Sequence, residues 1–280
     1  MARKSSRKKI LVVLAHPDDE SFGMGGTIAY QAAQGVDVHL ICATRGEAGT
    51  VDSQYLKRYK SIAKLREAEL GCAAKALGLK SVTYLGYRDS GMAGSQDNMH
   101  SSSLYRAPVQ KVAAQIASHI KKLKPQVVIT FDPVGGYHHP DHIAVHKATV
   151  KAFREAREAK AIEATTKLYY MARSRRRLRF IAGMMRLTGQ DPTRVGRNRD
   201  IDLTALARDP DTPPHVTINY KSVEARKRAA DECHASQQEG RFSRFSLLEL
   251  YWRLIGKRDT FTRAHPPTGE RYRSNDLFAN

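Results

Sequence analysis

Two short segments rich in histidine and aspartate carry the residue types that most often do chemistry in enzymes. The first runs from His16 to Glu20 and reads HPDDE, and the second runs from His138 to His142 and reads HHPDH. Zinc with an open catalytic position takes three protein ligands, commonly His and carboxylate, plus water. The two segments therefore indicate a metal centre, with His16, Asp19 and His142 as its ligands.

The spacing within each segment also suggests a division of roles. His16 and Asp19 are three residues apart, so in a helical turn they face the same way. Asp18 points elsewhere and remains free to take a proton from a metal-bound water, whose pKa zinc lowers toward about 7. His139 lies three residues before His142 and, if protonated, could stabilise a tetrahedral oxyanion or donate to a leaving nitrogen. This set predicts hydrolysis by Asp-assisted attack of zinc-bound water.

Each segment taken alone also fits a purely structural interpretation. An acidic run after a strand is favourable at a helix N-terminus, and His-Pro-Asp-His could be a turn followed by an Asp cap. Two such clusters at two strand ends, in a chain without a cysteine-based site, favour the metal centre. Zinc is the expected ion, and iron(II) fits similar ligands.

Apolar runs, together with the positions of Gly and Pro, predict strands that alternate with helices. We expect strands at 10–15, 36–43, 82–85, 127–131, 168–172 and 215–220, and helices at about 27–34, 57–77, 105–123, 141–158, 221–238 and 245–255. This alternation is typical of an α/β fold, here a Rossmann-like, mostly parallel sheet with helices on both faces. Such sheets bind ligands beyond the carboxyl ends of their strands, where both histidine clusters are expected.

The expected organisation is a basic flexible tail at 1–9 followed by a single α/β domain at 10–280. The stretch 173–214 interrupts the alternation because it is Arg-rich, contains four prolines and lacks clear periodicity. We interpret it as an insertion or lid rather than a second domain. Two parts of the sequence hold most of the net charge of +19. The tail at 1–9 has five Lys/Arg and no acid, and the stretch 151–200, which overlaps the Arg-rich stretch, has fourteen Lys/Arg against five acids. A solvated basic surface is the favoured interpretation, and attraction to a polyanion or acidic lipid is the alternative.

The N-terminal residues and the cysteines indicate in which cellular compartment the protein is expected. The apolar run at 10–15 has six residues, shorter than the roughly 7–15 of a signal-peptide core, and no run approaches the roughly 20 residues of a membrane span. We therefore expect a cytoplasmic protein without a transmembrane segment. Cys42, Cys72 and Cys233 are far apart and odd in number, which argues against a disulfide framework. For Cys42 and Cys72 we expect buried packing.

The two clusters resemble the signature motifs of a known family, the PIG-L/LmbE-like N-deacetylases. The segments that carry the resemblance are AHPDDE at 15–20 and HPDH at 139–142, followed by TRGE at 44–47, REAEL at 66–70, YRDSGM at 87–92 and HASQ at 234–237. That family includes N-acetylglucosaminyl-phosphatidylinositol deacetylase and the deacetylases of mycothiol and bacillithiol biosynthesis. The resemblance spans most of the chain, in order.

The resemblance implies a role for each candidate residue. The implied metal ligands are His16, Asp19 and His142, the implied catalytic residues are Asp18, His139 and Tyr137, and the implied substrate-binding residues are Arg66 and Asp89. The implied activity is that of a zinc-dependent hydrolase that removes an N-acetyl (acyl) group from an N-acetylglucosamine-type small molecule, at a carbon–nitrogen bond other than a peptide bond.

Two alternatives stay open at the level of sequence. One keeps the chemistry but acts on thiol conjugates or acylated natural products, and the other is a polyanion- or acidic-lipid-binding module that uses the basic stretch. The expected partner is an N-acyl sugar-like small molecule, which could be anionic. No specific nucleic acid is expected, because the basic stretch lacks interleaved aromatic residues. A homo-oligomer is compatible with the sequence.

Overall fold

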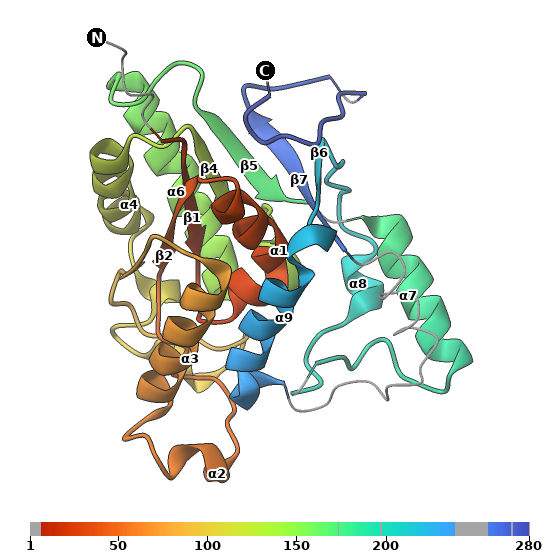
Figure 1. Cartoon of the computed structure of the whole chain (residues 1–280). Helices are drawn as coiled ribbons and strands as arrows, with labels where there is room; N and C mark the ends of the chain where they lie inside the picture. Colours follow the sequence, from red (N-terminus) through yellow and green to blue (C-terminus); the bar gives the residue numbers. More distant parts are fainter. Residues whose placement is uncertain (1–6, 173, 197, 239–256, 270, 280) are drawn as a thin grey trace.

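A seven-stranded sheet lies at the centre of the computed structural model, which describes residues 7–172, 174–196, 198–238, 257–269 and 271–279 (Figure 1). The strands are β1 (Lys9–Leu14), β2 (Asp37–Cys42), β3 (Ser81–Tyr84), β4 (Val127–Thr130), β5 (Lys167–Met171), β6 (Val216–Asn219) and β7 (Arg258–His265). Their order in the sheet is β3-β2-β1-β4-β5-β7-β6. The expected helix at 245–255 and most of the expected tail lie outside the described residues.

The first five strands are parallel, and the chain order reverses between β1 and β4. β1 pairs with β2 on one side, with Ile10 opposite Val38, and with β4 on the other, with Ile10 opposite Val127. Ile10 to Leu14 are fully buried, as expected for a central parallel strand covered on both faces. The predicted α/β, mostly parallel fold is thereby confirmed, with the carboxyl ends of β1 and β4 side by side at the switch point.

Helices cover both faces of the sheet. They are α1 (Asp19–Ala33), α2 (Ser53–Leu56), α3 (Ile62–Leu77), α4 (Val109–Leu123), α5 (Gly135–His138), α6 (Pro140–Glu158), α7 (Arg175–Leu187), α8 (Leu203–Leu206) and α9 (Glu224–Cys233). α1, α3 and α9 pack together on one face, and α4 packs against α6 on the other (Figure 1). In α4, for example, Val112, Ile116 and Ile120 recur at helical spacing and are all buried. Short 3-10 turns at Gln96–Met99, Leu104–Arg106, Lys221–Val223 and Ala235–Gln237 complete the elements.

Several boundaries differ from the sequence-based predictions for physical reasons. α1 begins at Asp19 rather than near residue 27, because its glycines, which are poor helix formers, are used for close packing. At Gly26 a Cβ atom would lie only 2.0 Å from the Tyr220 ring. β7 was missed because this antiparallel strand reads RDTFTRAH, in which Phe261 is the one large fully buried apolar side chain.

The Arg-rich stretch 173–214 was predicted to lack periodicity, but it contains the 13-residue helix α7. The helix buries Ile181 and Met185 against Val195 and Leu203, which form a small apolar cluster of their own. Arginines at 175–177, 179 and 186 interrupt the apolar residues of this helix, which conceals its periodicity in the sequence. α7 and α8 lie beside β6 and β7, at the right of Figure 1. The interpretation of this stretch as an insertion into one domain stays a prediction.

The prediction that no disulfide forms was wrong. Cys72 in α3 and Cys233 at the end of α9 are joined by a disulfide, and their Cα atoms are 5.7 Å apart. The pairing follows from the packing of α3 against α9, which a separation of 161 residues conceals in the sequence. Cys72 is also exposed rather than buried, whereas Cys42 is a buried free thiol as expected. Within the described residues, no helix has the length and apolar character that crossing a membrane requires.

Because this disulfide closes a long loop, replacing Cys72 and Cys233 together with serine should lower the free energy of unfolding by about 2–4 kcal/mol. Urea denaturation followed by circular dichroism measures the change. Wild-type protein treated with dithiothreitol should match the double variant. An intact mass that corresponds to three free thiols in the untreated, non-reduced protein would contradict the disulfide.

Candidate metal and catalytic site

The segment after β1 places three polar residues at the switch point. The chain leaves β1 at Leu14, turns, and enters α1 at Asp19. Asp18 has φ = 106°, a left-handed conformation that is unusual for a residue with a side chain. Such strain is typical of functional sites, because it separates the directions of neighbouring side chains. As a result Asp18 and Asp19 face different partners.

Side chains of three residues from the two histidine clusters face one another, with one ring nitrogen from each histidine and both carboxylate oxygens of Asp19 close together. His16 Nδ1 lies 3.3 Å from His142 Nε2 and 3.6 Å from Asp19 Oδ2, while Asp19 Oδ1 lies 3.3 Å from His142 Nε2. Ligand atoms about 2.0–2.2 Å from a tetrahedral zinc lie roughly 3.3–3.6 Å from one another. The separations within the predicted ligand set are therefore in the range that zinc ligands require, with either Asp19 oxygen close to a histidine nitrogen.

The other ring nitrogen of each histidine has a partner that fixes the tautomer. His142 Nδ1 lies 3.2 Å from the carbonyl oxygen of Gly135, which can only accept, so Nδ1 carries the proton. His16 Nε2 lies 3.1 Å from a carboxylate oxygen of Asp141 and 3.4 Å from one of Asp89. Both arrangements leave a lone pair on the nitrogen that faces the other two residues, as metal-ligating histidines require.

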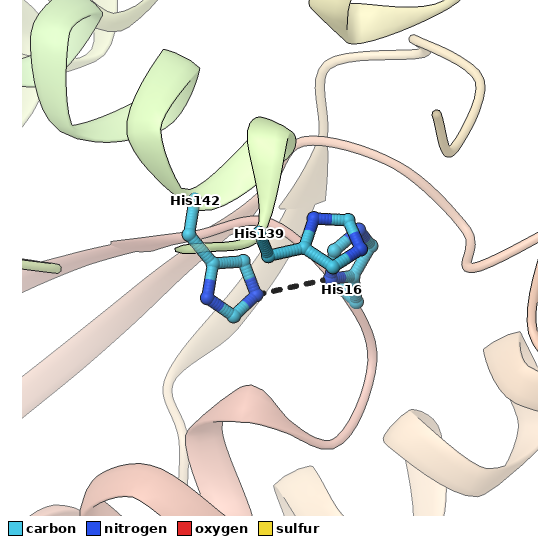
Figure 2. A group of neighbouring side chains, drawn as sticks. All are labelled: His16, His139 and His142. Atoms are coloured by element: carbon cyan, nitrogen blue, oxygen red, sulfur yellow. Dashed lines mark hydrogen bonds between the residues drawn. The ribbon is translucent and has the colours of Figure 1, made fainter. Parts of the chain in front are cut away.

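His139 is a third ring close to the other two (Figure 2). Ring nitrogens of His16, His139 and His142 lie within 4.8 Å of one another. His139 is the N-cap residue of α6, and its Nδ1 accepts a hydrogen bond of 3.2 Å from the backbone N–H of Asp141. This bond places the proton of a neutral His139 on Nε2. Burial lowers the pKa of His139 to about 2, so the ring is neutral.

Asp18 is held beside the ligand set by an arginine. Arg66 donates a hydrogen bond of 2.8 Å to the Asp18 carboxylate and further bonds to the carbonyl oxygens of Pro17 and Gly46. Gly46 must be glycine, because a Cβ atom there would meet the Arg66 guanidinium. Burial raises the pKa of Asp18 to about 6 although Arg66 opposes the shift.

Two buried polar pairs, Glu20 with His234 and Glu69 with Ser236, stabilise the turn between β1 and α1 and the helices next to it. Glu20 accepts from the backbone N–H of Asp18 (3.0 Å) and is hydrogen-bonded to His234 Nε2 (2.7 Å). Glu69 accepts from both the backbone N–H and the hydroxyl of Ser236. All four side chains are buried. The segment after α9 therefore fixes α1 and α3 relative to each other.

A cavity of about 350 Å³ opens above these residues, a volume within the usual range of small-molecule sites. Six of the predicted site residues line it: His16, Asp18, Arg66, Asp89, Tyr137 and His139. The other two, Asp19 and His142, lie next to His16. Tyr137 stands edge-on to His142, with ring centroids 5.0 Å apart, and burial raises the pKa of its hydroxyl well above the ordinary value.

Sequence reasoning gave Asp141 no role of its own. Its carboxylate accepts from the backbone N–H of Ser90 (2.9 Å) and faces His16, so it orients a ligand. A carboxylate one residue before a ligating histidine could have drawn attention to it. His146, four residues after His142 on α6, donates to the carbonyl oxygen of Phe131 (2.8 Å). Sequence reasoning also missed the residues beyond Val195 that line the cavity.

Comparison with known proteins agrees with the residue-level resemblance. Residues 11–153 match the family model described as PIG-L, GlcNAc-PI de-N-acetylase. A 1D-myo-inositol 2-acetamido-2-deoxy-alpha-D-glucopyranoside deacetylase from Acidothermus cellulolyticus is 38% identical over 239 residues, which cover 82% of this chain and 80% of that protein. A protein of the same name from Thermobifida fusca is 34% identical over 97% of this chain and 99% of its own.

A solved structure shares the fold at much lower identity. The 4-carboxy-2-hydroxymuconate hydratase from Pseudomonas putida superposes with a TM-score of 0.61 at 19% identity, covering 94% of this chain and 98% of that one. At this identity the likeness concerns the fold alone. The family model and the curated relatives show the family as well as the fold, since together they cover nearly the whole chain. The chain belongs to the PIG-L family of N-deacetylases.

Proposed function

We propose that this protein is a zinc-dependent hydrolase that removes the N-acetyl group of an N-acetylglucosamine-type glycoside. The observation that carries the proposal is the convergence of His16, Asp19 and His142, with the Asp18 carboxylate beside them but outside the ligand set. The names of the curated relatives support an inositol glycoside of N-acetylglucosamine as the substrate. The reaction yields acetate and a free amine.

His16, Asp19 and His142 would hold the metal. Zinc bound there supplies a Lewis acid and lowers the pKa of a coordinated water toward about 7. The Asp19 carboxylate suits this role, because His142 and His16 lower its pKa against the opposing effect of burial and keep it ionised. Two imidazoles and a carboxylate suit zinc, and iron(II) is the alternative ion.

Asp18 is the proposed general base. Its carboxylate lines the cavity and has a pKa raised by burial, so it can accept a proton from water more readily than an exposed aspartate. Arg66 holds the carboxylate in place and stabilises its charged form. The glycine-dependent contact of Arg66 with residue 46 fixes this arrangement without a contribution from the substrate.

His139 and Tyr137 are the proposed hydrogen-bond donors to the oxygen of the acyl group. The neutral His139 offers Nε2–H, because its Nδ1 is occupied by the backbone of α6. A protonated His139 was one expectation from the sequence, but its lowered pKa favours the neutral ring as a donor. Tyr137 keeps its proton because burial raises its pKa. Donors fixed in a partly enclosed site stabilise a developing oxyanion without reorganisation.

An amidase of thiol conjugates or a deacylase of natural products would use the same residues. Acetate release measured across N-acetylglucosaminyl-inositol, a thiol conjugate and an acylated aminoglycoside separates these activities. The shared fold of the hydratase does not favour a hydration reaction, because folds of this kind host unrelated chemistry.

Asp18→Asn should lower kcat by roughly 10²–10⁴-fold, because the amide cannot accept a proton. Bound zinc, measured by mass spectrometry of the native protein, should be unchanged, since Asp18 is outside the ligand set. Asp37→Asn on β2 is the matched control and should retain full turnover. Full activity in Asp18→Asn would overturn the assignment of the base.

Asp19→Ala should abolish tight zinc binding, because it removes one of three ligands. Competition with a chromogenic zinc chelator measures the affinity, and activity should fall in parallel. Wild-type protein stripped of metal should regain activity with zinc, and an anaerobic addition of iron(II) tests the alternative ion. Zinc affinity equal to that of the wild type would exclude Asp19 as a ligand.

Asp141→Asn should weaken zinc binding by roughly 10–100-fold while leaving one ion per chain at saturation, because it disturbs the partner that orients His16. The same chelator competition measures the change. Asp97→Asn, which alters a carboxylate paired with Arg88, is the control and should bind zinc normally. A complete loss of the site at saturating zinc would mean instead that Asp141 is itself a ligand.

A further inference from the structure

The Arg-rich insertion contributes to the wall of the catalytic cavity. Its residues Gly196, Asn198, Asp200 and Ile201 line the same space as His16, Asp18 and His139. None of the described contacts gives these residues a part in the catalytic arrangement around Asp18 and His142. Their place at the edge of the cavity suits contact with the part of a substrate that extends away from the reacting bond.

Asp200 lies on a turn whose first and last residues, Val195 and Ile201, are hydrogen-bonded to each other. Val195 and Ile201 exchange two backbone hydrogen bonds of 2.9 and 3.2 Å, which close the turn. Val195 packs with Ile181 and Met185 of α7. Asp202, just after the turn, accepts from two backbone N–H groups at the start of α8. A polar side chain on such a supported turn can contribute to specificity, because its position does not depend on the ligand.

The insertion is also tied to the catalytic segment itself. His138, next to His139, is paired with Asp209 of the insertion at 2.8 Å. Arg175 at the start of α7 donates to the carbonyl oxygen of Ala207 and, through its backbone N–H, to Asp211. These contacts tie the stretch that carries the turn to the segment next to His139.

The chemistry of the cavity wall points to a class of ligand. Among its described lining residues, Arg66 is the one cation, and it is paired with Asp18, whereas Asp89 and Asp200 add two further carboxylates. No described side chain forms a hydrogen bond or ion pair with the Asp200 carboxylate. A carboxylate accepts hydrogen bonds through two oxygens and so matches two adjacent hydroxyl groups.

We propose that Asp200, together with Asn198, is a specificity-determining residue that accepts hydrogen bonds from hydroxyl groups on a second, uncharged polyol ring attached to the N-acylated sugar. The inference rests on the proposed function and adds to it the residues that contact the second ring of the substrate. The acylated ring occupies the part of the cavity near His139 and Tyr137. The second ring reaches the turn of the insertion.

Asp200→Asn and Asp200→Ala test the proposal through kinetics with a long and a short substrate. For N-acetylglucosaminyl-inositol, we expect KM to rise roughly 10-fold or more, because a hydrogen bond to a charged group is lost, while kcat stays within about a factor of three. For N-acetylglucosamine alone, both constants should match those of the wild type. Asp191→Asn removes the same charge from the same insertion away from the cavity, and should change neither substrate's constants.

A binding measurement separates this proposal from the proposed function. In the Asp18→Asn background, calorimetric titration with N-acetylglucosaminyl-inositol should give a dissociation constant that rises roughly 10-fold when Asp200→Asn is added. If wild-type protein releases no acetate but this loss of affinity is seen, the proposed function fails and the polyol site stands. Equal affinity with and without Asp200→Asn, or an equal loss for both substrates, would overturn the role of Asp200.

Discussion

The parallel pairing of β1 with β4 is the constraint on which the site depends. Ile10 lies opposite Val127 and Val12 opposite Ile129, so the two strands end together at the same edge of the sheet. The turn after β1 carries His16, and the loop after β4 leads to His142, 126 residues later. Each strand is buried, so its backbone groups must pair within the sheet. A shift in this register would displace the two clusters from each other and separate the ligand atoms.

Buried charges around the turn after β1 form a second layer that depends on the same geometry. Burying a charge is costly unless a partner compensates it. Arg66 compensates Asp18, and His234 compensates Glu20, with the pKa of His234 raised by Glu20 against the effect of its own burial. These partners come from α3 and from the end of α9. The disulfide joins the same two helices, one residue before His234, so a covalent bond and a polar network hold the same part of the molecule together.

Much of this arrangement could be predicted from the sequence, because short-range patterns carry it. The apolar run at 10–15 predicted the central strand, and the histidine and aspartate clusters predicted which side chains lie together, Asp18 included. Long-range features were missed. The Cys72–Cys233 pairing leaves no local signal, and the position of Asp141 next to His142 does not show its contact with His16, since both contacts depend on how distant elements pack. β7 was missed because its polar residues obscure the alternation of an antiparallel strand.

Because a hydratase shares this fold, the fold does not determine which reaction is catalysed. The type of reaction must be inferred from the residues of the site. An ion held by three ligands can activate water for several reactions. What favours amide hydrolysis is a carboxylate beside the ligand set, with Asp18 held by Arg66, and two donors, Tyr137 and His139, above it. The proposed base and the proposed donors lie on the walls of one cavity, so a planar acyl group bound between them would be attacked on one face while its oxygen is stabilised. Residues of the Arg-rich stretch, Asp200 among them, line the same cavity, and we propose that they distinguish a glycoside from a simple amide.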